Sequence, residues 1–219
     1  MNTTVTSVHK ESLLPIALTY LSRGWSVFPV GKDKRPLVSW KTYQERLPTV
    51  DELVAWWNQF PEAQIGIATG KLSNLTVVDI EHGGDFDLIK DDTFTVKTGG
   101  NGIHKYFSYD GDFQNAVRIL PLVDLRSEGG YVVSAGSKTE KGDYEVISNV
   151  PVVQMSGETK EILTSARERQ KRSYGDSLAN RMHEQNLSSS TDGLNYSGYG
   201  QGQRNDEMTR YIGAVLARI

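Results

Sequence analysis

Two acidic residues close a short apolar stretch, residues 75–81, and their spacing suits the binding of a metal ion. The β-branched and aliphatic residues before them predict a buried strand. Because the side chains of a strand alternate between its faces, Asp79 and Glu81 point to one side while Val78 and Ile80 point to the other. Carboxylate oxygens are the ligands that a hard divalent cation prefers. Either the pair helps to hold such a cation, or the strand becomes polar where it reaches solvent.

A third acidic residue, Asp124, interrupts the apolar segment 123–126, and Arg126 follows it two residues later. In a strand these two side chains share a face. Either they form an internal ion pair, or Asp124 completes a site of three carboxylates while Arg126 contacts a phosphate or orients an acid. The two glycines that end residues 127–130 predict a hairpin turn into a strand at residues 131–133.

A glycine-rich loop at residues 98–102 precedes His104. Three glycines in five residues let backbone N–H groups approach an anion closely, so the loop, with Thr98, Gly100 and Gly102, is a candidate phosphate cradle. His104 opens the strand that follows this loop. A histidine at that place is either structural or a contact to a nucleotide phosphate.

A basic segment lies further upstream, at residues 31–41. Its cations, Lys32, Lys34, Arg35 and Lys41, either form an ordinary solvated turn or contact the phosphates of a nucleic-acid template or a nucleotide. The glycine of this segment does not belong to a P-loop, because the pattern G-x-x-x-x-G-K-[ST] is absent from the chain.

The flanking sequence supplies helices and strands that position these residues. Leucines at helical spacing predict a helix over residues 12–22, and Thr49 with Glu52 forms a capping box that opens another helix. Pro29 predicts that the strand at residues 25–30 lies at the edge of a sheet or that Pro29 lies near its end. Further strands are predicted at residues 64–68, 93–97 and 104–107. This order predicts a mixed α/β (α+β) fold.

Composition limits the classes of protein that the chain can belong to. A net charge of −3 over 219 residues gives no global basic signature, so any contact with nucleic acid must be a local patch. The absence of cysteine excludes disulfides and a cysteine-ligated zinc, and no zinc is expected. No apolar run has the length of a membrane span or a secretory signal, so we expect a cytosolic protein without a membrane partner.

The C-terminal third differs in composition from the rest. Apolar spacing predicts a helix from Ser156 to about Lys171. The basic residues at its end either bind nucleic acid or complement the helix dipole. Residues 173–203 are rich in Ser, Gly, Asn and Gln and predict a flexible linker. Residues 204–219 predict the start of an amphipathic helix that has no C-cap, so we expect further chain after Ile219.

Several of these motifs together resemble one family. Residues 78–81, 98–104 and 123–133, in this order, are similar to the bifunctional DNA primase/polymerase (prim-pol) domain of the archaeo-eukaryotic primase superfamily, found in phage and plasmid replication proteins. Upstream segments agree with it, namely residues 24–29, 34–36, 56–57 and 65–70. The resemblance extends from about Ala17 to Glu145.

The resemblance implies a fold and roles for individual residues. The family fold is an N-terminal αβ module beside an RRM-like catalytic sheet, with the active site in the cleft between them. The family's paired acids fall on Asp79 and Glu81 and its third acid on Asp124, and together they hold two divalent ions, Mg²⁺ or Mn²⁺. Its histidine falls on His104, which is expected to contact the phosphates of the incoming nucleotide.

The domain organisation that follows has four parts. We expect a catalytic domain at residues 1–155, a helical extension at 156–172, a linker at 173–203 and the start of a C-terminal helical domain at 204–219. The resemblance implies that such a helical domain often precedes a helicase.

The leading hypothesis is a template-directed DNA primase-polymerase that synthesises and extends primers on single-stranded DNA from (d)NTPs. It would act during phage or plasmid replication, in the cytoplasm of a bacterial or archaeal host cell. One alternative is a non-catalytic module that binds single-stranded DNA or a replication origin. Another is a metal-dependent nuclease that uses the same carboxylates.

Overall fold

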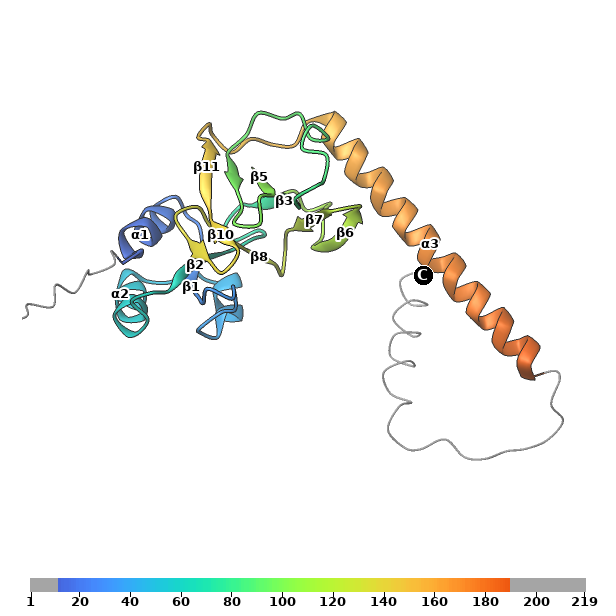
Figure 1. The fold of residues 1–219 in the computed structure, drawn as a ribbon, viewed down its shortest axis with the longest axis horizontal. Helices are drawn as coiled ribbons and strands as arrows, with labels where there is room; N and C mark the ends of the chain where they lie inside the picture. Colours follow the sequence, from blue (N-terminus) through green and yellow to red (C-terminus); the bar gives the residue numbers. More distant parts are fainter. Residues whose placement is uncertain (1–11, 190–219) are drawn as a thin grey trace, which may run out of the picture. The chain divides into compact units, whose positions relative to one another are not determined.

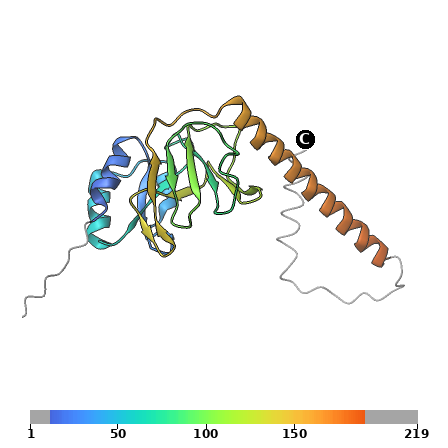
Figure 2. The ribbon, with the colours of Figure 1, turned by 45° about the horizontal axis from the view of Figure 1, so that its top comes forward.

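The chain folds as a mixed α+β protein whose antiparallel sheets carry the predicted site residues. The computed structural model describes the backbone of residues 12–189 and the side chains up to residue 173. By its internal contacts the chain divides into two units, Met1–Lys171 and Arg172–Ile219. The sheets and the site lie in the first unit, which Figures 1 and 2 show in two orientations.

The first unit opens with two helices beside a small sheet (Figure 1). Helix α1 spans Leu14–Ser22 and helix α2 spans Val50–Gln59, and they pack against each other and against strand β1, Val27–Val30. Strand β1 is the outer strand of a three-stranded antiparallel sheet with order β1-β2-β8, which confirms the edge position predicted from Pro29. Its other strands are β2 (Gln64–Ala68) and β8 (Tyr131–Val133). A short 3-10 helix, η1, spans Trp40–Gln44.

A second antiparallel sheet of six strands, with order β11-β4-β5-β3-β7-β6, carries the acidic motifs. Its strands are β3 (Thr76–Ile80), β4 (Thr95–Lys97), β5 (Ile103–Phe107), β6 (Ala116–Leu120), β7 (Val123–Arg126) and β11 (Glu145–Ser148). Two short strands, β9 (Lys138–Thr139) and β10 (Gly142–Asp143), form a separate hairpin.

Alternation along the central strand divides the buried side chains into two cores. Val77 belongs to a core that includes the rings of Trp25 and Tyr106, which stack with their centroids 5.8 Å apart. Val78 and Ile80 belong to a second core on the opposite face of the six-stranded sheet. Because Asp79 has the same parity as Val77, its carboxylate lies on the face of the first core. The two-residue alternation predicted for this strand is confirmed.

The hairpin predicted at residues 127–130 is wrong. Strands β7 and β8 belong to different sheets, so this segment carries the chain from the six-stranded sheet to the three-stranded one. Thr69 fixes the crossing, because its hydroxyl donates to the carbonyl of Ser127 at 2.7 Å and its N–H donates to the carbonyl of Gly130 at 3.0 Å. Strand β7 forms its hairpin with β6 instead, through a turn in which Leu122 has a φ of 59°.

The C-terminal helix is longer than predicted. Helix α3 spans Gly157–Ser189, so helical backbone covers the first part of the segment predicted as a linker. Leu163 and Ala166 of α3 are buried in the second core, which explains why the helix forms from its first turns. The rest of the predicted linker and the helix predicted at 204–219 lie outside the described residues. No helix within residues 12–189 is long and apolar enough to cross a membrane.

The start of α2 generates a prediction about stability. The capping box is present: Glu52 accepts the N–H of Thr49 at 2.8 Å, and the hydroxyl of Thr49 accepts the N–H of Glu52 at 3.1 Å. Glu52 also accepts a hydrogen bond from Arg46 at 2.6 Å. Mainly because of Arg46, the pKa of Glu52 falls from 4.5 to about 2.

The charge of Glu52 therefore stabilises the folded state above pH 4.5, and this stabilisation is lost as the pH falls towards the folded pKa of about 2. We expect Glu52→Gln to lower the free energy of unfolding by about 1 kcal/mol at pH 7, and by less at pH 3. Urea denaturation at both pH values measures the difference. Glu45→Gln, at a neighbouring exposed carboxylate, is the control. An equal loss at both pH values would contradict the role of this charge.

Candidate active site

Three polar side chains from distant parts of the sequence meet across neighbouring strands. In the register of the six-stranded sheet, Asp79 on β3 lies opposite His104 on β5 and opposite Asp124 on β7. Directly paired residues of antiparallel strands point to the same face, about 4.5–5.5 Å apart at Cβ. The strand register alone therefore gathers these three residues.

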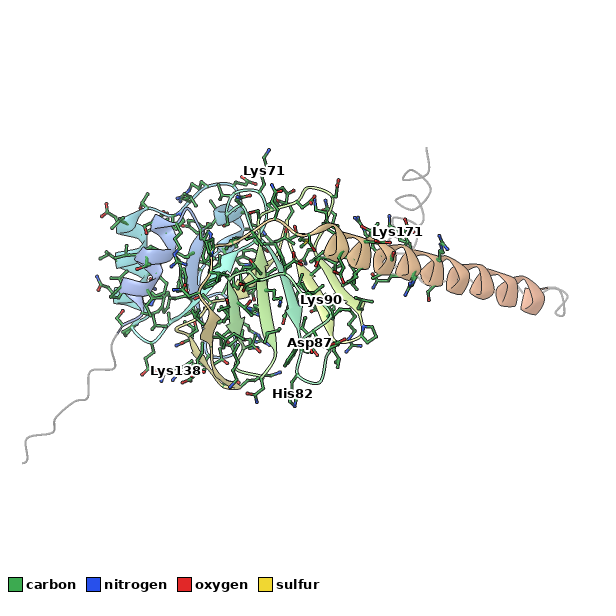
Figure 3. The ribbon with its side chains drawn as sticks, turned by 90° about the horizontal axis from the view of Figure 1, so that it is seen from above. Lys71, His82, Asp87, Lys90, Lys138 and Lys171 are labelled. Carbon is green, nitrogen blue, oxygen red and sulfur yellow. The ribbon has the colours of Figure 1, made fainter. Side chains whose placement is uncertain are left out.

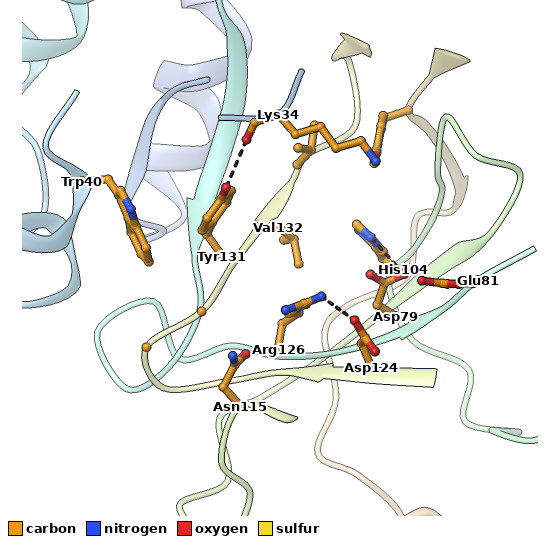
Figure 4. A pocket seen from close by; sticks show the side chains of 14 residues that line it. Lys34, Trp40, Asp79, Glu81, His104, Asn115, Asp124, Arg126, Tyr131 and Val132 are labelled. Atoms are coloured by element: carbon orange, nitrogen blue, oxygen red, sulfur yellow. Dashed lines mark hydrogen bonds and ion pairs between the residues drawn. The ribbon is translucent and has the colours of Figure 1, made fainter. Parts of the chain in front are cut away.

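They line a cavity with a volume of about 440 Å³. Figure 4 shows Asp79, Glu81, His104 and Asp124 on one side of it, Trp40 and Tyr131 on the other, and Arg126 between the two groups, while the side chain of Lys34 extends from the Tyr131 side towards His104. The remaining lining residues are Asn115, Gly129, Gly130, Val132, Val133 and Tyr144. The cavity thus combines three carboxylates, two permanent cations, a histidine and aromatic side chains.

Asp79 is held as a carboxylate by its surroundings. Its Oδ1 lies 3.4 Å from Nε2 of His104. Burial by itself would raise the pKa of Asp79, but His104 and the charges of Arg126 and Lys34 outweigh it, so the pKa lies below its ordinary value. Asp79 is therefore ionised at neutral pH although its side chain is only 23% exposed.

His104 is almost completely buried behind Asp79. Its ring lies 5.8 Å from the ring of Tyr144 and 6.2 Å from that of Tyr106. Its Nδ1 is buried and has no hydrogen-bond partner among the described residues. A histidine that packs only as a structural residue usually has both ring nitrogens satisfied. The orphaned nitrogen therefore favours the functional interpretation of His104.

Asp124 is fixed by two contacts. Its Oδ2 lies 2.5 Å from Nη2 of Arg126, and its Oδ1 accepts the backbone N–H of Arg118 at 2.7 Å. Arg118 has a φ of 51°, at the irregularity in the register of β6 that turns this N–H towards the carboxylate. The internal ion pair, one of the two interpretations of Asp124 and Arg126, is therefore present, and it lies inside the cavity.

Glu81 extends the row of carboxylates towards solvent. It follows the last residue of β3 and continues the ladder, because its N–H donates to the carbonyl of Leu122 at 2.8 Å. Its side chain is exposed at the cavity, on the same face as Asp79. The prediction that these two carboxylates point the same way is confirmed.

The donor set fits a hard divalent cation in its chemistry. Asp79, Glu81 and Asp124 offer only carboxylate oxygens, which suit Mg²⁺ or Mn²⁺. Among the described residues no group of three or more histidine or acidic side chains is already arranged to hold a metal ion. At Asp124, Arg118 and Arg126 each donate one hydrogen bond to a carboxylate oxygen, which leaves further lone pairs on both oxygens.

The glycine-rich loop does not line the cavity. Within it, the N–H of Thr98 donates to the carbonyl of Gly102 at 2.9 Å, and the N–H of Gly102 donates to the hydroxyl of Thr98 at 3.1 Å. These amides are therefore not directed at an anion. At Gly102 the backbone approaches strand β3 so closely that a Cβ would lie 2.4 Å from the carbonyl oxygen of Ile80. Phosphate binding by Thr98, Gly100 and Gly102 remains a prediction.

The basic segment is divided by the structure. Lys34 lines the cavity, whereas Lys32 lies 2.9 Å from Glu62 and the exposed Arg35 lies 3.7 Å from Asp33. Lys41 is exposed on the 3-10 helix η1. These three cations remain predicted contacts to nucleic acid outside the cavity.

Sequence patterns missed several cavity residues. Trp40, Tyr131 and Tyr144 are aromatic residues that single-sequence reasoning assigns to packing, and Asn115 lies in a segment without a periodic pattern. Burial first, and then the charge of Asp79, raises the pKa of Tyr144 to about 12. Its position next to two short strands left no signal in the sequence.

Comparison with protein families identifies the class of protein that carries this cavity. Residues 17–158 match the family model described as bifunctional DNA primase/polymerase, N-terminal. The match covers more than half of the chain and includes all of the predicted site residues, so the chain belongs to this family. It is a DNA primase/polymerase, a nucleotidyltransferase of DNA replication that acts on a DNA template and nucleotides. The comparison with curated proteins gave no match.

The close approach at Gly102 predicts that this glycine is needed for backbone packing. We expect Gly102→Ala to lower the free energy of unfolding by about 1–3 kcal/mol, because the added Cβ would force strands β3 and β5 apart beside Asp79. Gly100→Ala is the matched control, since its Cβ would meet nothing nearer than 4.0 Å. Urea denaturation measures both variants. Equal stability of the two would contradict the packing role.

Proposed function

We propose that the chain is a template-directed DNA primase-polymerase that synthesises primers on single-stranded DNA and extends them by nucleotidyl transfer. The observation that carries the proposal is the convergence of Asp79, Glu81, Asp124 and His104 on one cavity, within the residues that match the family. Phosphoryl transfer depends on positioning and charge stabilisation more than on covalent chemistry, and this cavity offers both.

Asp79, Glu81 and Asp124 are the residues that would hold the divalent ions, for which we propose two Mg²⁺ or Mn²⁺. When bound, such ions supply activation of the attacking 3′-hydroxyl and neutralisation of charge on the leaving pyrophosphate. The chain's own part is to keep Asp79 ionised beside His104 and to orient Asp124 through the N–H of Arg118.

Two further residues of the cavity suit the nucleotide. Arg126 presents a guanidinium between the acidic and the aromatic side of the cavity, where it suits a phosphate. His104, whose Nδ1 lacks a partner, is the proposed second contact to the nucleotide. Lys32, Arg35 and Lys41, outside the cavity, are proposed to contact the template strand.

The wider setting follows from the resemblance to phage and plasmid replication proteins. We propose the archaeo-eukaryotic primase fold for residues 1–155, with an αβ module beside an RRM-like sheet, and a role in phage or plasmid replication within a host cell. A helicase partner, or a helicase in the same chain beyond residue 219, belongs to this proposal.

Primer extension tests the proposed function. With a primed template, labelled dNTPs and Mn²⁺, we expect extension by the wild-type chain and a loss of about 10²-fold or more in Asp79→Asn, because a carboxylate for the ions is removed while the shape of the side chain is kept. Asp124→Asn should lose as much. Asp87→Asn, at an exposed carboxylate of the surface shown in Figure 3, is the control.

Other outcomes would select among the alternatives. Shortening of a labelled strand, lost in Asp79→Asn, would indicate the metal-dependent nuclease. Binding of single-stranded DNA without any synthesis on primed or unprimed template would favour the binding module. Equal extension by wild type and Asp79→Asn would overturn the assignment of the site.

A further inference from the structure

Lys34 stands apart from the other cations of its segment. It lines the cavity, whereas Lys32 and Arg35 lie beside acidic residues of the surface. Among the described residues, no carboxylate oxygen lies within 4.0 Å of the Lys34 ammonium. A cation directed at a cavity and without an acidic partner is available to an anionic ligand.

The backbone holds Lys34 in a sterically unfavourable conformation. Its φ is 70°, in the left-handed region that non-glycine residues rarely adopt. The turn is closed on itself, because the N–H of Lys34 donates to the carbonyl of Gly31 at 2.9 Å and the N–H of Gly31 donates to the carbonyl of Arg35 at 2.8 Å. Such strained positions persist only where the surroundings enforce them, and they cluster at ligand sites.

Tyr131 ties this turn to the wall of the cavity. Its hydroxyl donates to the backbone carbonyl of Lys34 at 3.1 Å, across 97 residues of sequence (Figure 4). The Tyr131 ring is itself fixed, since it packs edge-on against Trp40 with centroids 4.9 Å apart. The position of Lys34 is therefore set by strand β8 and not by the exposed loop alone.

The ammonium of Lys34 reaches the acidic side of the cavity. Its Nζ lies 5.6 Å from the centre of the Tyr144 ring, and the ring of His104 lies 5.8 Å from the same Tyr144 ring. Lys34 is also one of the charges that act on Asp79. Lys34 and Arg126 thus place two cations in the cavity that holds the three carboxylates.

We propose that Lys34 binds the phosphate groups of the incoming nucleoside triphosphate, and that Tyr131 is the residue that positions it. The inference rests on the proposed function and refines it, because it assigns Lys34 to the nucleotide, one of the two ligands that the sequence left open for the basic segment. A triphosphate carries several negative charges, and a lysine serves phosphate as a compact point charge. The cavity location favours the nucleotide over a template strand, which would cover the exposed surface that holds Lys32, Arg35 and Lys41.

The test separates nucleotide binding from DNA binding. Binding of a labelled dNTP is measured in the presence of Ca²⁺ without DNA, binding of a labelled single strand is measured by anisotropy, and KM and kcat come from primer extension. In Lys34→Met we expect the nucleotide Kd and KM to rise about tenfold or more, with the single-strand Kd changed less than twofold. Tyr131→Phe should raise KM severalfold and leave kcat nearly unchanged. Lys71→Met, at a lysine that projects from the surface in Figure 3, is the control.

A second variant distinguishes loss of the Lys34 side chain from misfolding of the protein. Lys34→Gly removes the same side chain but relieves the backbone, because glycine adopts a φ of 70° without strain. We expect it to lose nucleotide affinity as Lys34→Met does while its unfolding midpoint is equal to or above that of the wild type. Lys34→Arg, which keeps the charge, should recover most of the affinity.

Three results would overturn the inference. A Lys34→Met variant that binds single-stranded DNA more weakly, with unchanged nucleotide KM, would place Lys34 on the template. Unchanged values for both ligands would deny it any substrate role. If the wild-type chain bound no triphosphate, the proposed ligand of Lys34 would be wrong. In contrast, a wild-type chain that binds nucleotide through Lys34 but extends no primer would contradict only the proposed polymerase function.

Discussion

The register of strand β3 against its two neighbours is the constraint on which the site depends. It places Asp79 opposite His104 on one side and opposite Asp124 on the other. A shift of one residue in either pairing would turn one partner to the opposite face of the sheet. The apolar neighbours of Asp79 on β3 prevent such a shift, because Val78 and Ile80 are completely buried in the second core. The packing of one face thus fixes the chemistry of the other.

Two of the carboxylates in this cavity face side chains of the protein that a ligand can displace. Asp79 faces His104 at 3.4 Å, and Asp124 faces Arg126 at 2.5 Å. Each buried charge needs a partner, since an unpaired one would cost several kcal/mol. The same pairs lie where divalent ions and phosphates are proposed to bind. We propose that these carboxylates, which face His104 and Arg126 in the free chain, exchange these partners for ligand charges.

The crossing between the two sheets completes the site. Residues 127–130 lead from β7, which carries Asp124 and Arg126, to β8, which begins with Tyr131. Gly130 fits there because a Cβ would lie 2.5 Å from Oδ1 of Asn115. A hairpin at this point would have kept Tyr131 in the six-stranded sheet, away from Lys34. The crossing therefore brings strand β7, which carries Asp124, and the turn that carries Lys34 to one cavity.

The sequence by itself determined which residues are candidates, because strand alternation, the capping box at Thr49 and Glu52 and the family motifs are local signals that tertiary contacts did not override. Only the tertiary structure decided which candidates meet. In the structure, Lys34 lines the cavity and Lys32 does not, and Tyr144 is a further lining residue. It also extended helix α3 to Ser189, past the boundary that composition suggested. Such outcomes depend on contacts between residues far apart in the chain, and no short-range pattern records them.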